Sequence, residues 1–157
     1  MADNLVDTGD ASSHVLRDLF VMPLRDEVEL PDGFISDPKD RGDGDAPMVL
    51  TSLPDSGLLY PHVIVERASQ SGDSLDRHGD TWEHDMEIRV TVHSLSSTQA
   101  NKLIDGIVAW FEINQWWLHN NGFMDTATGP IQDANWEAGA RVNTVQITFR
   151  GRLTTTP

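Results

Sequence analysis

Residues 81–94, TWEHDMEIRVTVHS, alternate between apolar and polar side chains over almost their whole length. This period of two predicts a long β-strand with one face in a core and a polar second face. A sheet built on such a strand can turn its polar face to water, to a lumen or to a partner. One face carries Trp82, His84, Met86, Ile88, Val90 and Val92, and the other carries Glu83, Asp85, Glu87, Arg89, Thr91 and His93.

A helix is predicted directly after this strand. Ser96 and Gln99 have the spacing of a capping box, and Asn120, Asn121 and Gly122 supply a stop signal. The apolar residues between them recur every three or four positions, as in a helix that packs on a sheet. This apolar stripe consists of Ala100, Leu103, Ile104, Ile107, Val108 and Phe111.

The other elements are placed by the same signals. Apolar residues at helical spacing predict an N-terminal helix at 15–20, which Pro23 is expected to end. The β-branched run 62–65 predicts a strand that forms a hairpin with the long strand, and 69–79 is its flexible tip. Further strands are expected at 48–53, 123–128 and 141–153.

This order favours a single α+β domain over residues 1–157. The main elements run helix, strand, strand, helix, strand, strand, so we expect a four-stranded, mainly antiparallel sheet packed by two helices. Residues 1–11 are expected to be disordered or extended. Residues 31–59 are rich in proline, glycine and aspartate, and are expected to form an acidic, extended excursion.

The charge of the chain is strongly acidic. Asp and Glu number 25 against 11 Lys and Arg, which gives a net charge of −14, and Lys39 and Lys102 are the two lysines. Few lysines and many aspartates are typical of a halophilic protein, because in about 1 M salt charges are screened beyond roughly 3 Å. An ordinary acidic protein is the alternative. Tight sequence-independent binding to nucleic acid is not expected, because it requires clustered Lys and Arg.

Chemical motifs give no positive sign of an enzyme. The six histidines show no HxxxH or HxH spacing, and His84 on the apolar face is read as a buried, hydrogen-bonded residue. Asp40, Asp43 and Asp45 lack the spacing of a calcium loop. GxSxG, P-loop, GxGxxG and cysteine motifs are all missing from the sequence. We therefore expect no enzyme activity, no metal site and no cofactor beyond loosely bound Mg, Ca or K counter-ions.

Two groups of residues are candidates for a subunit or partner interface. The long strand carries acidic residues and the last strand carries basic residues, so copies of the chain that pack side by side could meet head to tail and close into a ring. The alternative is that these charges pair within one subunit. The charged candidates are Glu83, Asp85, Glu87, Arg141, Arg150 and Arg152. Trp116 and Trp117 lie beyond the apolar stripe, and are read either as interface anchors or as edge-of-core residues.

The order of elements resembles the tail terminator proteins of long-tailed viruses over residues 12–153. The resemblance is carried by VLRDLF at 15–20, YPHVIVE at 60–66, MEIRVTV at 86–92, the helix around Leu103 and Ile104, and the last strand. It implies a hexameric ring that caps the tail tube, joins it to the head–tail connector or stopper protein, and lets DNA pass without sequence-specific binding. It also implies a place in the tail or neck of a virion assembled in the host cytoplasm.

Two other functions remain open at this point. One is a neighbouring neck protein, such as a head-completion or stopper protein, or a tail tube subunit. The other is a non-viral halophilic domain that binds a ligand between its sheet and its helices. The sequence has no apolar run of the roughly 18–20 residues that a membrane span needs, and its first residues do not resemble a signal peptide. No membrane partner is therefore expected.

Overall fold

The computed structural model describes residues 6–7, 14–26, 49–51, 62–74, 82–94, 96–133 and 143–156. The expected extended segment 1–11 and acidic excursion 31–59 lie outside the described residues, apart from the short strands β1 (Val6–Asp7) and β2 (Val49–Leu50) and residue 51. The domain limits therefore stay predictions.

Three long strands form the body of the sheet. These are β3 (His62–Ser74), β4 (Trp82–Ser94) and β7 (Asn143–Thr156), and both neighbours pair antiparallel with the central β4. The predicted hairpin of 62–65 with the long strand is confirmed. The predicted flexible tip at 69–79 is wrong for residues 69–74, because β3 continues through these polar residues to Ser74, paired with β4.

The prediction of four strands is wrong in number, since the described residues contribute seven strands to one sheet. The edge of β7 that faces away from β4 pairs with β1, with β5 (Met124–Thr128) and with β6 (Gln132–Asp133). β2 pairs with β3 in parallel, as β1 does with β7. The three strands beyond the predicted four, β1, β2 and β6, are each only two residues long, so no periodic signal could reveal their pairing, although β2 lies within the strand segment expected at 48–53.

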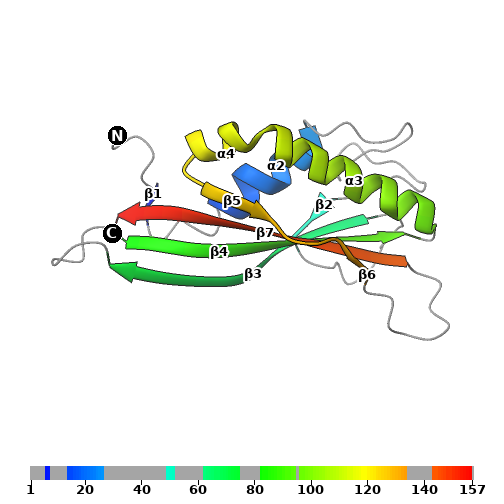
Figure 1. The fold of residues 1–157 in the computed structure, drawn as a ribbon, viewed down its shortest axis with the longest axis horizontal. Helices are drawn as coiled ribbons and strands as arrows, with labels where there is room; N and C mark the ends of the chain where they lie inside the picture. The colour runs from blue at the N-terminus through cyan, green and yellow to red at the C-terminus, as the bar shows by residue number, and fades with distance from the viewer. Residues whose placement is uncertain are drawn as a thin grey trace.

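The helices formed by the described residues all lie on one face of this sheet (Figure 1). They are η3 (His14–Val21, a π-type helix), α2 (Met22–Asp26), α3 (Ser97–Ile113) and α4 (Gln115–Asn120). The α+β class is therefore confirmed, and the helix, strand, strand, helix, strand, strand order survives among the main elements with short elements added to it. We refer to the sheet face opposite the helices as the outer face.

Two predicted helix ends are wrong. Pro23 does not end the first helix but lies in the first turn of α2, where proline is tolerated because its missing N–H has no acceptor within the helix. The central helix does not run unbroken to Asn120. Asn114 adopts ψ 26°, and its side-chain amide donates to the Trp110 carbonyl at 2.8 Å, which separates α3 from α4.

The helix start is predicted correctly at Ser96, but the capping box is only half formed. The Ser96 hydroxyl accepts from the backbone N–H of Gln99 at 3.3 Å. The Gln99 side chain accepts instead from the Ser94 hydroxyl at 2.6 Å, and the Ser96 N–H donates to Ser94 at 3.1 Å. Ser94 therefore replaces Gln99 as the acceptor for the Ser96 N–H, and its hydrogen bonds connect the end of β4 to the start of α3.

The core lies between the sheet and the helices, as the alternation of β4 predicts. Met86, Ile88, Val90 and Val92 point inward and are buried. His84 lies on the same face, and its ring contacts Thr155 Oγ1 at 2.9 Å and Gln70 Nε2 at 3.1 Å, which confirms a hydrogen-bonded buried histidine. The helix stripe faces them, with five of its six residues fully buried: Ala100, Leu103, Ile104, Ile107 and Phe111.

Four phenylalanines occupy the centre of the core. The ring of Phe20 from η3 lies 4.6 Å from Phe111, 5.5 Å from Phe149 and 5.9 Å from Phe123, measured between ring centroids. The first helix is thereby fixed to α3, to the sheet and to the segment after α4. His14 adds a polar contact, because its Nε2 lies 2.7 Å from the Asn121 carbonyl oxygen.

Candidate subunit interface

The charged residues of β4 and β7 face each other directly on the outer face. The antiparallel register sets Glu87 opposite Arg150 and Asp85 opposite Arg152. Arg150 Nε lies 2.7 Å from Glu87 Oε1, and Arg152 Nε lies 3.1 Å from Asp85 Oδ1. A further pair joins β3 to β4, with Arg89 Nη1 at 3.2 Å from Glu66 Oε1.

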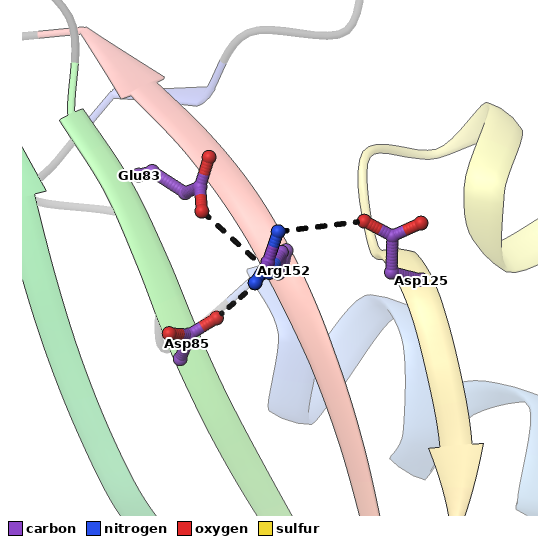
Figure 2. Close-up of polar contacts among 4 residues, drawn as sticks. All are labelled: Glu83, Asp85, Asp125 and Arg152. Atoms are coloured by element: carbon purple, nitrogen blue, oxygen red, sulfur yellow. Dashed lines mark hydrogen bonds and ion pairs between the residues drawn. The ribbon is translucent and has the colours of Figure 1, made fainter. Parts of the chain in front are cut away.

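Arg152 is the centre of this charge network (Figure 2). Besides Asp85 it contacts Glu83, at 3.5 Å, and Asp125 from β5, at 3.9 Å. Three carboxylates from two other strands therefore converge on one guanidinium. Each pair is partly exposed, so its individual contribution to stability is small, although charges in a network support each other.

The backbone of Asp125 explains how its side chain reaches β7. Its φ is 53°, in the left-handed region that non-glycine residues seldom adopt, and the pairing of β5 with β7 shifts register between Met124 and Ala127. A register shift of this kind changes the direction in which a side chain points. Figure 2 shows one carboxylate oxygen of Asp125 directed at Arg152 and the other directed away from it.

The charges proposed for a head-to-tail contact are therefore paired within one chain, which is the alternative that the sequence left open. This applies to five of the six charged candidates, Glu83, Asp85, Glu87, Arg150 and Arg152. Arg141 lies outside the described residues. The internal pairs do not decide whether a second copy also contacts this face, because Arg150 keeps 71% of its side chain exposed. The interface assignment of these residues stays a prediction.

The outer face is not uniformly open. At the end formed by Asp85 and Arg152 the side chains are exposed, whereas His62, Ile64 and Thr91 near the other end are buried. The ring of His62 stacks on that of His93 with centroids 4.7 Å apart, and His93 Nδ1 lies 3.1 Å from Thr144 Oγ1. The polar face predicted from the alternation of β4 is thus exposed at one end of the sheet and buried at the other.

The two candidate tryptophans, Trp116 and Trp117, lie on α4 in the helical layer. Trp116 is 76% exposed and Ile113, three residues before it, is 80% exposed. Trp117 packs edge-on against Trp110 at 5.6 Å and is half-buried, so it combines an edge-of-core position with partial exposure. Ile113 was missed by sequence reasoning, although its position outside the apolar stripe of α3 was a usable signal.

A pocket of about 360 Å³ opens between α4 and β5. Trp116 forms one wall, and the edge of the His119 ring meets the Trp116 ring at 5.7 Å and 75°. Asp125 also lines the pocket, with Gln115 and Thr126 completing the lining. No sequence pattern singles out Asp125, because its left-handed backbone occurs at an aspartate and not at a glycine, which would mark the position.

The described residues give no indication of a metal site. Within the described ranges, no group of three or more His, Cys, Asp or Glu side chains could hold a metal ion. Asp40, Asp43 and Asp45 are outside those ranges. Among the same residues, no helix is both long enough and apolar enough to cross a membrane.

Acid is expected to destabilise the His62–His93 end of the sheet. Burial lowers the pKa of His93 below its usual 6.5, so the unfolded chain binds this proton more readily than the folded chain. The stabilisation that depends on a neutral His93 is therefore complete above pH 6.5 and is lost as the pH falls below 6.5. Melting temperatures measured from pH 7.5 to 5.5 test this, with His93→Asn expected to flatten the fall. The exposed His119→Gln is the control, and equal slopes for wild type and His93→Asn would contradict the prediction.

Comparison with known proteins gives little that bears on function. No protein-family model matches the chain, and no curated protein sequence matches it. Among solved structures, the chain is similar to part of the "Virion of native gene transfer agent (GTA) particle", with 14% sequence identity, 68% of this chain and 78% of that chain covered, and a TM-score of 0.39. Two structures with so low a score need not share a fold, so nothing below depends on this likeness.

Proposed function

We propose that this chain is a structural protein of a virus particle, and more narrowly a tail terminator that assembles as a ring. The observation that supports the proposal is the order and layering of the elements. A first helix, a long β-hairpin, a second helix and a long last strand fold into one sheet with all described helices on one face. This arrangement is the one expected from the resemblance to tail terminator proteins.

The surface supports assembly with further copies or partners. Ile113 and Trp116 are large apolar side chains that lie three residues apart in the sequence and are mostly exposed. Large exposed aromatic residues are enriched where protein interfaces concentrate their binding energy. In a hexameric ring, this part of the helical layer and the exposed end of the outer face are the surfaces that we expect to meet neighbours.

The acidic charge suits a ring that DNA traverses. A net charge of −14 makes the protein as a whole repel a nucleic-acid duplex. A channel lined in this way lets DNA pass and does not hold it. We accordingly propose the tail tube protein and the head–tail connector or stopper protein as partners, in a virion assembled in the host cytoplasm.

We further propose that the protein is not an enzyme and uses no cofactor apart from loosely bound counter-ions. The proposed role as a tail terminator requires contacts with other proteins and no catalysed reaction. The rival hypothesis of a ligand-binding domain placed the ligand between sheet and helices, but that space is filled by Phe20, Phe111, Phe123 and Phe149, each at most 3% exposed. A stopper protein of the neck remains the alternative, since it too would be a small ring-forming subunit.

The terminator proposal is tested by where the protein binds. Labelled protein is mixed with assembled tail tubes and with isolated connectors from the same virus, and both are imaged by electron microscopy. Label at one tube end, with tubes that no longer lengthen, is the expected result. Label on connectors alone would identify a stopper instead, and binding to neither would contradict both assignments.

Arg150 offers a test of whether the outer face takes part in the ring. We expect Arg150→Glu to remain folded, with a loss of about 1 kcal/mol or less, because an exposed pair is lost and two acidic residues then face each other. We also expect the ring to dissociate. Chemical denaturation measures the first effect and sedimentation measures the second.

The charge-swapped variant, Arg150→Glu with Glu87→Arg, is the matched control. It restores the pair across β4 and β7 and should regain stability, yet a neighbour that contacts Arg150 would still meet the wrong charge. A swapped variant that assembles like wild type would show that the pair acts only within the subunit.

A further inference from the structure

The pocket between α4 and β5 combines an aromatic wall with a carboxylate. The wall is the indole of Trp116, which is 76% exposed, and the carboxylate is that of Asp125, whose side chain is 72% exposed. Neither side chain is covered by the chain's own described residues. The two come from different elements and meet only in the fold.

Both walls of the pocket are held in position. His119 lies one helical turn from Trp116 on α4 and meets its ring edge-on, which restricts the indole. Asp125 is held by a left-handed backbone in the irregular start of β5, with one carboxylate oxygen at 3.9 Å from Arg152. The other oxygen points away from Arg152 (Figure 2). A fixed aromatic face beside an accessible carboxylate oxygen is a preorganised arrangement.

The chemistry of these walls selects a cation. The face of an indole attracts cations through its quadrupole, and a carboxylate adds a charge-assisted hydrogen bond. Arginine satisfies both more fully than lysine, because its planar guanidinium stacks on an aromatic ring while its N–H groups reach a carboxylate. The volume of about 360 Å³ can accept such a side chain.

We propose that this pocket binds an arginine side chain presented by an adjoining protein subunit. Charge complementarity supports this occupant, because the chain carries a net charge of −14 and a partner with an exposed arginine is favoured at its surface. The exposed Ile113 lies on the turn before Trp116 and adds apolar area around the inserted side chain. The inference depends on the pocket alone, so its failure would leave the proposed function standing.

The test uses N-acetyl-arginine-methylamide as the probe and the uncharged N-acetyl-citrulline-methylamide as its isostere. Binding is followed by the indole N–H signal of Trp116 in two-dimensional nuclear magnetic resonance spectra, at the lowest salt concentration in which the protein remains folded. We expect a saturable shift of this signal with the arginine compound and none with the citrulline compound. Equal shifts with both compounds, or no shift with either, would overturn the proposal.

Two variants of equal charge separate the pocket from the general acidity of the chain. Asp125→Asn keeps a residue that tolerates the left-handed backbone, and should weaken arginine binding about two- to fivefold, the range of an exposed ion pair. Asp105→Asn removes an exposed carboxylate from α3 and should leave binding unchanged. If both variants weaken binding equally, the attraction comes from net charge and the pocket has no role.

Discussion

Replacing Gly151 with alanine is expected to destabilise the protein by about 3 kcal/mol, at the upper end of the usual cost of overpacking. Gly151 lies on the inner face of β7, and a Cβ atom built there would stand 2.4–2.6 Å from three atoms of the Phe123 ring. That ring cannot move aside easily, because Phe123 is fully buried and packs edge-on against Phe20. Denaturant unfolding followed by circular dichroism measures the loss.

The double variant Gly151→Ala with Phe123→Leu provides the control for this steric explanation. A leucine leaves the space that the added methyl group needs, so the double variant should lose clearly less stability than the sum of the two single variants. Strictly additive losses would mean that the ring of Phe123 is not what excludes a side chain at position 151.

Replacing Phe20 with alanine is the second change with a large expected effect, a loss of about 3–5 kcal/mol. Phe20 is fully buried and its ring contacts those of Phe111, Phe123 and Phe149. Its removal leaves a cavity where the first helix, α3 and the sheet meet. We therefore expect a lower unfolding midpoint and faster amide hydrogen exchange in η3.

Met22→Ala is the matched control for Phe20→Ala. Met22 lies two residues further on and is 40% exposed, so the same kind of truncation should cost little there. If both variants lose the same stability, the first helix does not depend on the phenylalanine cluster, and the packing described for the core is wrong.

The parts of the fold that were predictable are those in which burial repeats with a regular period. The alternation at 82–94 identifies the buried face of β4, because consecutive side chains of a strand point to opposite faces. The stripe from Ala100 to Phe111 identifies the buried face of α3 in the same way. β1, β2 and β6 show no such period, because each has only two residues. Their pairing depends on where the rest of the fold places them.

Helix ends were predicted less well, because they depend on single side chains with more than one available partner. Asn114 could continue a helix, but its amide bonds the Trp110 carbonyl and separates α3 from α4. Pro23 could stop a helix or stand in its first turn, and the packing of the neighbouring Val21 and Leu24 in the core favours the second outcome. Propensity alone could not choose between these outcomes.

The contacts within the candidate interface were also hard to predict from the sequence. The sequence showed opposite charges on the long strand and the last strand, but not the register that sets Glu87 against Arg150 and Asp85 against Arg152. That register is fixed by the buried residues on the other face, since a shift by one residue would expose them. Asp125 contributes to the pocket only through its unusual backbone, which a single sequence does not reveal.

The central claim is that this protein acts as a ring of identical subunits, and its mass in solution tests that claim most directly. Wild-type protein is purified in molar KCl and its mass is measured by sedimentation equilibrium, with electron micrographs of the same sample. One species of six 17.4 kDa chains, seen as rings of uniform diameter, is the expected result. A single 17.4 kDa chain at every protein concentration would contradict the account.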